Sequence, residues 1–393
     1  MMKNIFIVGS KGIPGKYGGY ESFVDYLTKS HQDEQNIKYH VACKSIEKGE
    51  FKYNNARCFN IKVPNIGSSQ AIYYDVMALR DCCVYIRRNK IENPIIYILA
   101  CRIGPFIAYF RRRIHQLGGE VYINPDGHEW KRAKWSLLVR KYWKISEKTM
   151  VKHADLIICD SKKIEEYIIK TYKQYSPKTT FISYGAEIKQ SSIEEKNEML
   201  LSWYKENDVS SHDYYLIVGR LVPENNYETM IREFMKSKTK KSLILITDIA
   251  NNYYERLRKI TKWDEDKRIK FVGTIYDREL LKKIRENAFA YVHGHEVGGT
   301  NPSLLEALGS TKINLLLDVE FNREVGAEAA LYWTKENESL VNLMKYAEGI
   351  DNEQMESLGM SAKKRIENNY SWQSIANKYK ELFFEGIVEN EKG

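Results

Sequence analysis

A glycine-rich segment follows the first apolar run of the chain and could bind an anion. Residues 9–19 read GSKGIPGKYGG, so five glycines fall within eleven residues, and a helical pattern starts near Glu21. Glycine lets a backbone approach a ligand closely, and N–H groups at the start of a helix attract negative charge. The glycine spacing is not G-x-G-x-x-G, which argues against a nicotinamide site. The segment also lacks the G-K-[ST] of a P-loop. We predict a ligand-facing loop in which Gly15, Gly18 and Gly19 bind a phosphorylated donor, rather than a flexible strand–helix connection.

A second segment combines titratable, aromatic and basic side chains after another apolar run. Residues 124–135 read NPDGHEWKRAKW. Asp126 and His128 are candidate catalytic groups because a carboxylate or an imidazole can orient a hydroxyl for attack. Trp130 offers a flat apolar face to a sugar ring, and Lys131 and Arg132 suit the phosphate of an acceptor. The alternative, that Asp126 caps a helix whose tryptophans pack and whose bases are solvated, stays open.

An arginine in the second half of the chain is placed to hold a diphosphate. Residues 217–226 read IVGRLVPENN, in which Arg220 stands just past an apolar run. A guanidinium there can form two parallel hydrogen bonds to phosphate oxygens. The alternative is an ordinary surface arginine.

The last segment with candidate ligand contacts spans residues 293–306 and reads HGHEVGGTNPSLLE. Gly298, Gly299, Thr300 and Asn301 could present backbone N–H groups to a phosphate or a sugar hydroxyl. Glu306 lies one to two turns into the following helix, where a carboxylate suits a ribose hydroxyl. We predict that these residues bind the same phosphorylated donor as the glycine-rich segment.

The cysteines form neither a redox nor a metal-binding pattern. The six are Cys43, Cys58, Cys82, Cys83, Cys101 and Cys159. They include no C-x-x-C pair and no Cys/His cluster with zinc spacing, so we expect free thiols in a reducing compartment and no metal site. The first apolar run starts at Ile5 without a signal peptide before it, and we expect a cytosolic location.

These segments must be positioned by strands that alternate with helices. The predicted strands of the first half are Ile5–Val8, Tyr39–Ala42, Ile95–Leu99, Val121–Ile123, Leu156–Cys159 and Thr180–Ser183. Those of the second half are Tyr214–Val218, Ser242–Thr247, Ile269–Val272, Ala290–His293, Ile313–Leu317 and Ala330–Trp333. Apolar strands separated by amphipathic stretches predict parallel sheets covered on both faces.

A polar stretch, Ile188–Asp213, interrupts the alternation and predicts two domains. We expect one domain over 1–188 and a second over 214–370. A helix within 371–393 could cross back to the first domain. In two doubly wound sheets, the crevice at the carboxyl ends of the strands is the default ligand site.

The charge distribution favours an anionic partner for the first half. The net charge is +9, but residues 1–190 hold 32 Lys and Arg against 18 Asp and Glu, whereas the remaining residues hold 29 against 34. The excess peaks between Arg80 and Lys152. A basic half attracts nucleic acid, an anionic bilayer or a phosphorylated acceptor. No nucleic-acid motif is present, so we expect no nucleic-acid partner.

No window is long and apolar enough to predict a spanning helix. The nearest approach, Ile95–Phe110, contains Arg102 and precedes Arg111, Arg112 and Arg113. One interpretation is a buried strand, a loop and a helix start. The other is an interfacial segment whose apolar face enters lipid while the three arginines meet head-groups.

Together the four segments resemble the retaining GT-B glycosyltransferases of family 4, in particular bacterial capsule and cell-wall rhamnosyltransferases. GSKGIPGKYGGYE, NPDGHEWKR, VGRLVPENNYE and HEVGGTNPSLLEA carry the resemblance, which spans nearly the whole chain. It implies two Rossmann-like domains facing a crevice, namely an acceptor-binding, membrane-facing domain over 1–188 and a nucleotide-sugar-binding domain over 214–370, and no metal cofactor. Two positions depart from the family pattern. Gly298 stands where the first glutamate of Glu-x₇-Glu is usual, so Glu296 could substitute, and Asn225 stands where a lysine is usual.

The resemblance implies a transfer of L-rhamnose from dTDP-L-rhamnose to a sugar on a polyprenyl diphosphate, in capsule or cell-wall synthesis at the inner face of the plasma membrane. Arg220 would stabilise the leaving diphosphate, and Asp126 or His128 would orient the acceptor hydroxyl. The alternatives are a UDP-hexose or N-acetylhexosamine transferase of the same fold, or a nucleotide-sugar epimerase or phosphorylase.

Overall fold

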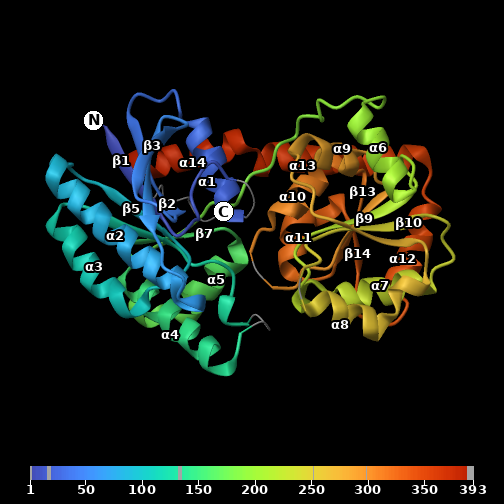
Figure 1. Cartoon of the computed structure of the whole chain (residues 1–393), viewed down its shortest axis with the longest axis horizontal. Coiled ribbons are helices and arrows are strands. Elements are labelled where there is room, and N and C mark those ends of the chain that lie inside the picture. The colour runs from blue at the N-terminus through green and yellow to red at the C-terminus, as the bar shows by residue number, and fades with distance from the viewer. Residues whose placement is uncertain (1, 16–18, 132–134, 251, 298, 387–393) are drawn as a thin grey trace. The chain divides into compact units, whose positions relative to one another are not determined.

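The computed structural model describes residues 2–15, 19–131, 135–250, 252–297 and 299–386. The chain divides into two compact units (Figure 1). The N-terminal unit comprises Met1–Gly185 and Trp372–Gly393, and the C-terminal unit comprises Ala186–Ser371.

The N-terminal unit is built on an eight-stranded sheet of order β3-β4-β2-β1-β5-β6-β7-β8. Its strands are β1 (Lys3–Val8), β2 (Ile37–Ser45), β3 (Gly49–Tyr53), β4 (Ala56–Lys62), β5 (Ile95–Leu99), β6 (Glu120–Asn124), β7 (Leu156–Cys159) and β8 (Thr179–Phe181). All neighbours pair in parallel except β3 and β4, which form an antiparallel hairpin that we did not predict. The edge strand β3 is almost wholly exposed, so it lacks the apolar run that marks a buried parallel strand.

Helices cover both faces of this sheet. They are α1 (Gly19–Ser30), α2 (Gln70–Asn89), α3 (Gly104–Gln116), α4 (Leu137–His153), α5 (Lys162–Thr171) and α14 (Trp372–Glu385). Successive residues of β5 point to opposite faces. Ile96 and Ile98 pack with α2, α3 and Met150 of α4. Tyr97 points the other way, where its hydroxyl contacts that of Tyr379 in α14 at 3.0 Å and its ring meets Phe23 of α1.

The segment Ile95–Phe110 follows the first of our two interpretations. β5 is completely buried, and α3 begins at Gly104 with Pro105 in its first turn, where the missing N–H of proline does no harm. Gly104 is required there because a Cβ would lie 2.4 Å from the Cα of Ser146 in α4. Among the described residues, no helix has the length and apolar character that crossing a bilayer needs.

The C-terminal unit has a six-stranded sheet, all parallel, of order β11-β10-β9-β12-β13-β14. The strands are β9 (Tyr214–Val218), β10 (Ser242–Ile246), β11 (Ile269–Gly273), β12 (Ala290–His293), β13 (Ile313–Leu317) and β14 (Leu331–Trp333). The helices are α6 (Glu198–Asn207), α7 (Tyr227–Lys236), α8 (Asn252–Thr261), α9 (Arg278–Glu286), α10 (Pro302–Ser310), α11 (Glu320–Gly326), α12 (Ser339–Glu348) and α13 (Asn352–Tyr370).

Two apolar clusters enclose the second sheet. Tyr215 and Ile217 of β9 pack with α7, α8 and α12, whereas Tyr214 and Leu216 pack with α6, α9 and α10. The polar stretch over 188–213, which we expected to join two domains, contains α6. Its residue Trp203 is buried against Tyr214. The predicted class, α/β with two doubly wound parallel sheets, is confirmed.

Candidate functional site

The glycine-rich loop after β1 uses its own polar groups to fold against α1. The N–H of Lys11 donates to Glu21 Oε1 at 2.7 Å, and the N–H of Gly15 donates to Asp25 Oδ2 at 3.0 Å. Both acceptors lie in the first two turns of α1, which begins at Gly19. Two amides that we expected to face a ligand are therefore already occupied, and both acceptors are carboxylates.

Close packing explains three glycines of this loop, Gly9, Gly12 and Gly15. A Cβ would lie 2.2 Å from the carbonyl oxygen of Leu99 at Gly9, 2.5 Å from Cys43 Sγ at Gly12, and 2.8 Å from the carbonyl oxygen of Glu21 at Gly15. At these positions the backbone lies so close to its neighbours that only glycine, which has no Cβ, fits there. Gly18, which we predicted to bind the donor, lies outside the described residues.

Arg102 joins this loop to the end of β5, a role that our sequence analysis missed. Its Nη1 donates to the carbonyl oxygen of Gly9 at 2.7 Å and lies 3.3 Å from Asp75 Oδ2. Burial raises the pKa of Asp75 to about 6, and Arg102 opposes that rise. Burial lowers the pKa of Arg102, but Asp75, Tyr20 and Asp126 together raise it, so the guanidinium stays charged. The sequence did place an arginine directly after a strand, but we counted it only as a break in an apolar run.

Asp126 lies at the carboxyl end of β6 in a left-handed backbone conformation. Its φ is +59°, its N–H donates to Asn124 Oδ1 at 2.8 Å, and its Oδ1 accepts from the N–H of Gly127 at 2.8 Å. The next long helix, α4, begins only at Leu137. Asp126 therefore organises a tight turn rather than capping α4, and its half-buried carboxylate remains within electrostatic reach of Arg102.

His128 is buried behind Asp126 instead of standing beside it. Its ring centroid lies 4.3 Å from that of Tyr167 and 5.9 Å from that of Trp130. Burial, with the positive charges of Lys131 and Lys144, lowers the pKa of His128 to about 4. The imidazole is therefore neutral at physiological pH.

Trp130 shares its ring with cations. Lys144 Nζ lies 4.3 Å and Lys131 Nζ 5.4 Å from the ring centroid, so a sugar would have to displace or join the lysines. Trp135 is only partly buried and donates from Nε1 to Glu129 Oε1 at 2.8 Å. Arg132 lies outside the described residues.

In the C-terminal unit, Arg220 follows β9 and points into solvent. Among the described residues, no acidic side chain pairs with its guanidinium. The buried Asn225 donates from Nδ2 to the carbonyl oxygen of Arg220 at 2.8 Å, and Tyr227 donates to that of Gly219 at 3.0 Å. Asn225, predicted as a donor contact, thus shapes the loop that presents Arg220.

Glu296 connects the loop after β12 to the loop after β9. Its Oε2 lies 2.5 Å from Lys335 Nζ and 3.3 Å from Asn226 Nδ2, and its N–H donates to the carbonyl oxygen of Glu224 at 3.2 Å. Arg220 and Glu296 therefore come from neighbouring loops of one sheet edge. Since strands β9 and β12 are adjacent in the sheet, the two loops that follow them lie at the same edge, although some seventy residues separate them in the sequence.

Two of the predicted donor contacts at α10 are engaged within the protein, one in a helix cap and one in an ion pair. Asn301 accepts from the N–H groups of Ser303 and Leu304 at 2.9 and 3.3 Å, which satisfies two of the free donors of the helix. Glu306 Oε2 lies 2.6 Å from Arg285 Nη2 of α9 and is half exposed. Among the other predicted contacts, Thr300 is buried, Gly299 is half-buried, and Gly298 lies outside the described residues.

The described residues contain no group of three or more His, Cys, Asp or Glu side chains arranged to hold a metal ion. The one Asp-x-Asp sequence of the chain, at Asp264 and Asp266, is engaged elsewhere. Asp264 pairs with Arg258 at 2.8 Å and Asp266 with Arg268 at 2.6 Å.

Comparison with known proteins follows the division of the chain. Residues 2–187 match a family described as a domain of unknown function, DUF1972. No curated protein matches the chain.

Solved structures match over the whole chain at low identity. Sucrose-phosphate synthase from Thermosynechococcus elongatus is 15% identical, with 98% of this chain and 99% of that chain covered and a TM-score of 0.78. A glycosyltransferase from Rickettsia africae is 12% identical, with 99% of each chain covered and a TM-score of 0.73. Anabaena Alr3699/HepE in complex with UDP-glucose is 14% identical, with 98% and 100% covered and a TM-score of 0.70. These likenesses show the fold, which is that of GT-B glycosyltransferases, as predicted.

Proposed function

We propose that this protein is a retaining glycosyltransferase that moves a sugar from a nucleotide-diphosphate donor to an acceptor hydroxyl. The observation that carries the proposal is the sheet edge of the C-terminal unit, where Arg220 and Glu296 come from the loops after the adjacent strands β9 and β12, with Glu306 on the helix that follows β12. Among the described residues, Arg220 pairs with no acidic side chain. A GT-B fold supports it, because structures of that fold include one described as a complex with UDP-glucose and one bound to UDP-2-fluoro glucose.

The reaction breaks the bond between the anomeric carbon and the diphosphate and forms one from that carbon to the acceptor oxygen. Negative charge grows on the departing diphosphate, and the Arg220 guanidinium neutralises it. The acceptor hydroxyl loses its proton as it attacks. We assign its orientation to Asp126, since the half-buried carboxylate at the end of β6 is more accessible than the buried imidazole of His128.

We further propose dTDP-L-rhamnose as the donor and a saccharide on a polyprenyl diphosphate as the acceptor, on the basis of the sequence resemblance. The C-terminal unit would bind the donor, and the N-terminal unit the acceptor. The N-terminal unit would also dock peripherally on the anionic cytoplasmic face of the plasma membrane. The second candidate donor is a UDP-hexose, favoured by the UDP and UDP-glucose complexes among the structural neighbours.

A thermal-shift screen tests the donor. At a ligand concentration about a hundred times the Kd, a bound nucleotide sugar stabilises the folded protein by about 2.7 kcal/mol, which raises the melting temperature measurably. We expect dTDP-L-rhamnose and dTDP to give the largest shift in the absence of divalent metal. A larger shift with UDP-glucose would select the second candidate. No shift with any nucleotide sugar, or a shift that requires manganese, would refute the proposed donor site.

A further inference from the structure

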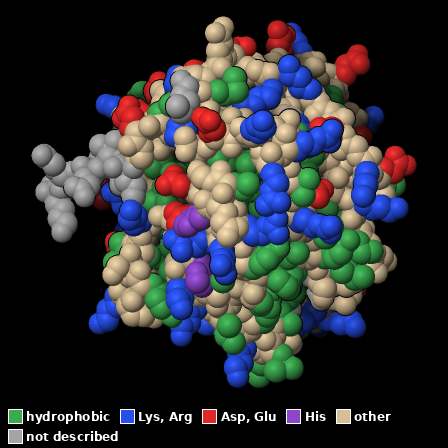
Figure 2. Space-filling model, turned by 90° about the vertical axis from the view of Figure 1, so that its left-hand side faces the viewer, with side chains coloured by type: hydrophobic (Ala, Val, Ile, Leu, Met, Phe, Trp, Pro, Cys, Tyr) green, Lys and Arg blue, Asp and Glu red, His purple; other side chains and the backbone are tan. Residues whose placement is uncertain are grey.

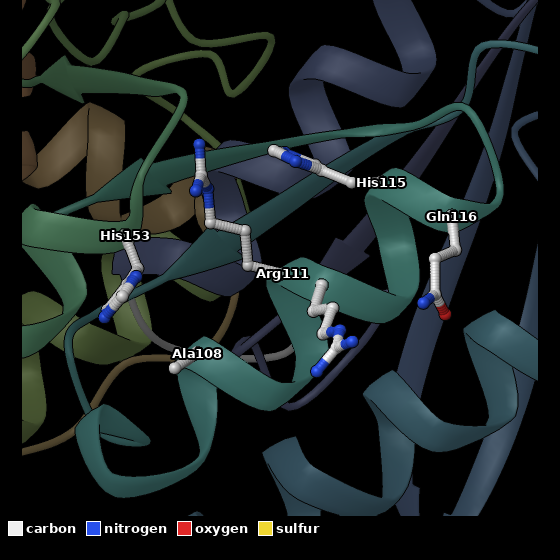
Figure 3. Close-up of a pocket in the computed structure, with 6 residues that line it drawn as sticks. Ala108, Arg111, His115, Gln116 and His153 are labelled. Atoms are coloured by element: carbon white, nitrogen blue, oxygen red, sulfur yellow. The ribbon is translucent and has the colours of Figure 1, made fainter.

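A cavity of about 530 Å³ opens on the N-terminal unit at the edge of the sheet opposite the candidate site. It is lined by Ala108, Arg111, Arg112, His115 and Gln116 of α3 and by His153 at the end of α4 (Figure 3). The second half of α3 and the end of α4 lead into the amino ends of β6 and β7, whereas Arg102 and Asp126 follow carboxyl ends. The cavity is therefore separate from the proposed transfer site.

Asp155 holds two of the lining side chains, Arg111 and His115, in place. Its Oδ1 lies 2.8 Å from Arg111 Nη2, its Oδ2 lies 2.7 Å from His115 Nε2, and Oδ2 also accepts from the N–H of Val121 at 2.8 Å. Arg112 and His153 also line the cavity, and neither has a partner among the described residues. One carboxylate thus stands against two arginines, so the lining keeps an excess of positive charge. Burial, with the charges of Lys152 and Arg111, lowers the pKa of His153, so this imidazole offers a hydrogen-bonding group rather than a charge.

The helix α4 ends at the cavity with His153 and exposes large apolar side chains at its beginning and middle, and the neighbouring helices α2 and α3 expose others beside basic residues. On α4, Leu137 is 80% exposed, Leu138 82% and Ile145 53%. On the neighbouring helices, Val84 of α2 and Tyr109 of α3 are each 58% exposed. The exposed basic residues of the same helices include Arg87, Arg88, Arg112, Lys141 and Lys148. Figure 2 shows hydrophobic side chains lying among lysines and arginines on this face.

We propose that the cavity binds the phosphate of an anionic phospholipid head-group while the exposed residues of α4 enter the bilayer interface. This inference rests on the peripheral docking proposed above and gives it a discrete lipid site. Two guanidinium groups that line one hollow match a phosphate, which accepts charge-assisted hydrogen bonds from arginine, and the lining imidazoles add further hydrogen-bonding groups. Exposed leucines beside lysines match the boundary between acyl chains and head-groups, where apolar side chains enter and basic ones remain outside.

The test is co-sedimentation with vesicles of phosphatidylcholine, alone or mixed with phosphatidylglycerol. Arg112→Gln removes one charge from the cavity, and Arg88→Gln removes one charge from α2 as a matched control. Charge alone weakens binding roughly fivefold per basic residue. We expect Arg112→Gln to lose at least about ten times more affinity than Arg88→Gln for the mixed vesicles. Equal losses would overturn the discrete site and leave only a diffuse basic surface.

Two further arms separate the source of the phosphate and the function of the enzyme. Leu137→Ser with Leu138→Ser should lower vesicle binding even at low salt, and unchanged binding would overturn the insertion of α4. Inorganic phosphate that stabilises the wild type but not Arg112→Gln, without any vesicle binding, would identify a soluble ligand and overturn the lipid. Arg112→Gln should keep wild-type transfer to a soluble acceptor analogue. If the wild type itself transfers nothing to that analogue, the proposed function fails whatever the vesicles show.

Discussion

Asp126 and His128 lie two residues apart, yet the fold gives them different environments. Asp126 ends β6 with its carboxylate half exposed, whereas His128 packs against Tyr167. The sequence could not choose between them, because both follow the same strand. Burial favours Asp126 for the proposed role, since a residue that orients an acceptor must be reachable by it.

The pH dependence of the reaction should reflect this difference. Because the pKa of His128 is lowered to about 4, its imidazole does not titrate between about pH 5.5 and 8. We expect Asp126→Asn to lower kcat roughly a hundredfold or more, as loss of a positioned acid or base does, and His128→Gln to lower it less than about tenfold. The pH profiles of kcat/KM for the wild type and both variants measure this. An inflection near pH 6.5 that disappears in His128→Gln would reverse the assignment.

In the proposed mechanism, Arg220 is the residue on which donor binding depends most directly. Arg220→Ala should weaken donor binding and lower kcat, because the charge on the leaving group grows in the transition state. Loss of a hydrogen bond to a charged group costs about 1.5–3 kcal/mol, which is roughly a tenfold to hundredfold loss in kcat/KM. Arg256→Ala, at an exposed arginine of α8, is the matched control and should leave both constants unchanged. Unaltered kinetics in Arg220→Ala would remove this residue from the site.

At the scale of elements, the β1 loop and α1 form one interlocked unit. Carboxylates of α1 hold the amides of Lys11 and Gly15, and Arg102 holds the carbonyl oxygen of Gly9. The polar groups of this glycine-rich loop therefore serve first to pack the loop against α1 and β5. Any phosphate that approaches it must also meet the negative charges of Glu21 and Asp25.

The packing role of Gly12 can be measured separately from its backbone conformation. Its φ is +106°, and an added Cβ would lie 2.5 Å from Cys43 Sγ. Gly12→Ala should lower the free energy of unfolding by about 2–4 kcal/mol, from backbone strain and overpacking together. The control is Gly118→Ala, where φ is +75° and nothing lies within 4 Å of the new Cβ. It should cost only about 1–2 kcal/mol. Urea denaturation curves of both variants measure these losses. Equal losses of unfolding free energy would mean that the loop accommodates the Cβ at position 12 without overpacking.

At the scale of the whole molecule, both units contain histidines that the fold keeps neutral. Burial, with help from Arg57 and Lys38, lowers the pKa of His40 in the N-terminal unit to about 3. Burial alone lowers that of His293 in the C-terminal unit to about 3. In the unfolded chain these groups take up a proton near pH 6.5.

The unfolded chain therefore binds more protons than the native protein below about pH 6.5, so stability must fall as the pH falls. The loss is up to about 2 kcal/mol for each such histidine at pH 5. We expect the urea midpoint to decline from pH 7.5 to pH 5, and to decline less steeply in His40→Asn and His293→Asn. A midpoint that is constant or rises on acidification would show that these side chains are protonated in the native protein.

The sequence alone determined the strands that follow unmistakable apolar runs and, from their alternation with helices, two doubly wound sheets. It also placed Arg220 and Asp126 just beyond strands, and Glu306 in the helix that follows one. In a parallel sheet all carboxyl ends share one edge, so position in the sequence already implies position at that edge. It did not predict the β3–β4 hairpin, whose exposed edge strand carries no apolar run, or the helix α6 within a polar stretch.

Only the tertiary structure decided which of the predicted residues are free for a ligand. Asn225 was expected to contact a donor, but it is buried and supports the loop of Arg220, and Asn301 caps α10. Arg102, which we had counted only as a break in an apolar run, joins the glycine loop to Asp75. The physical reason is that hydrogen-bond partners and desolvation come from segments far apart in the chain. Local sequence fixes what a side chain can do chemically, whereas distant neighbours fix whether it is charged, reachable or already engaged.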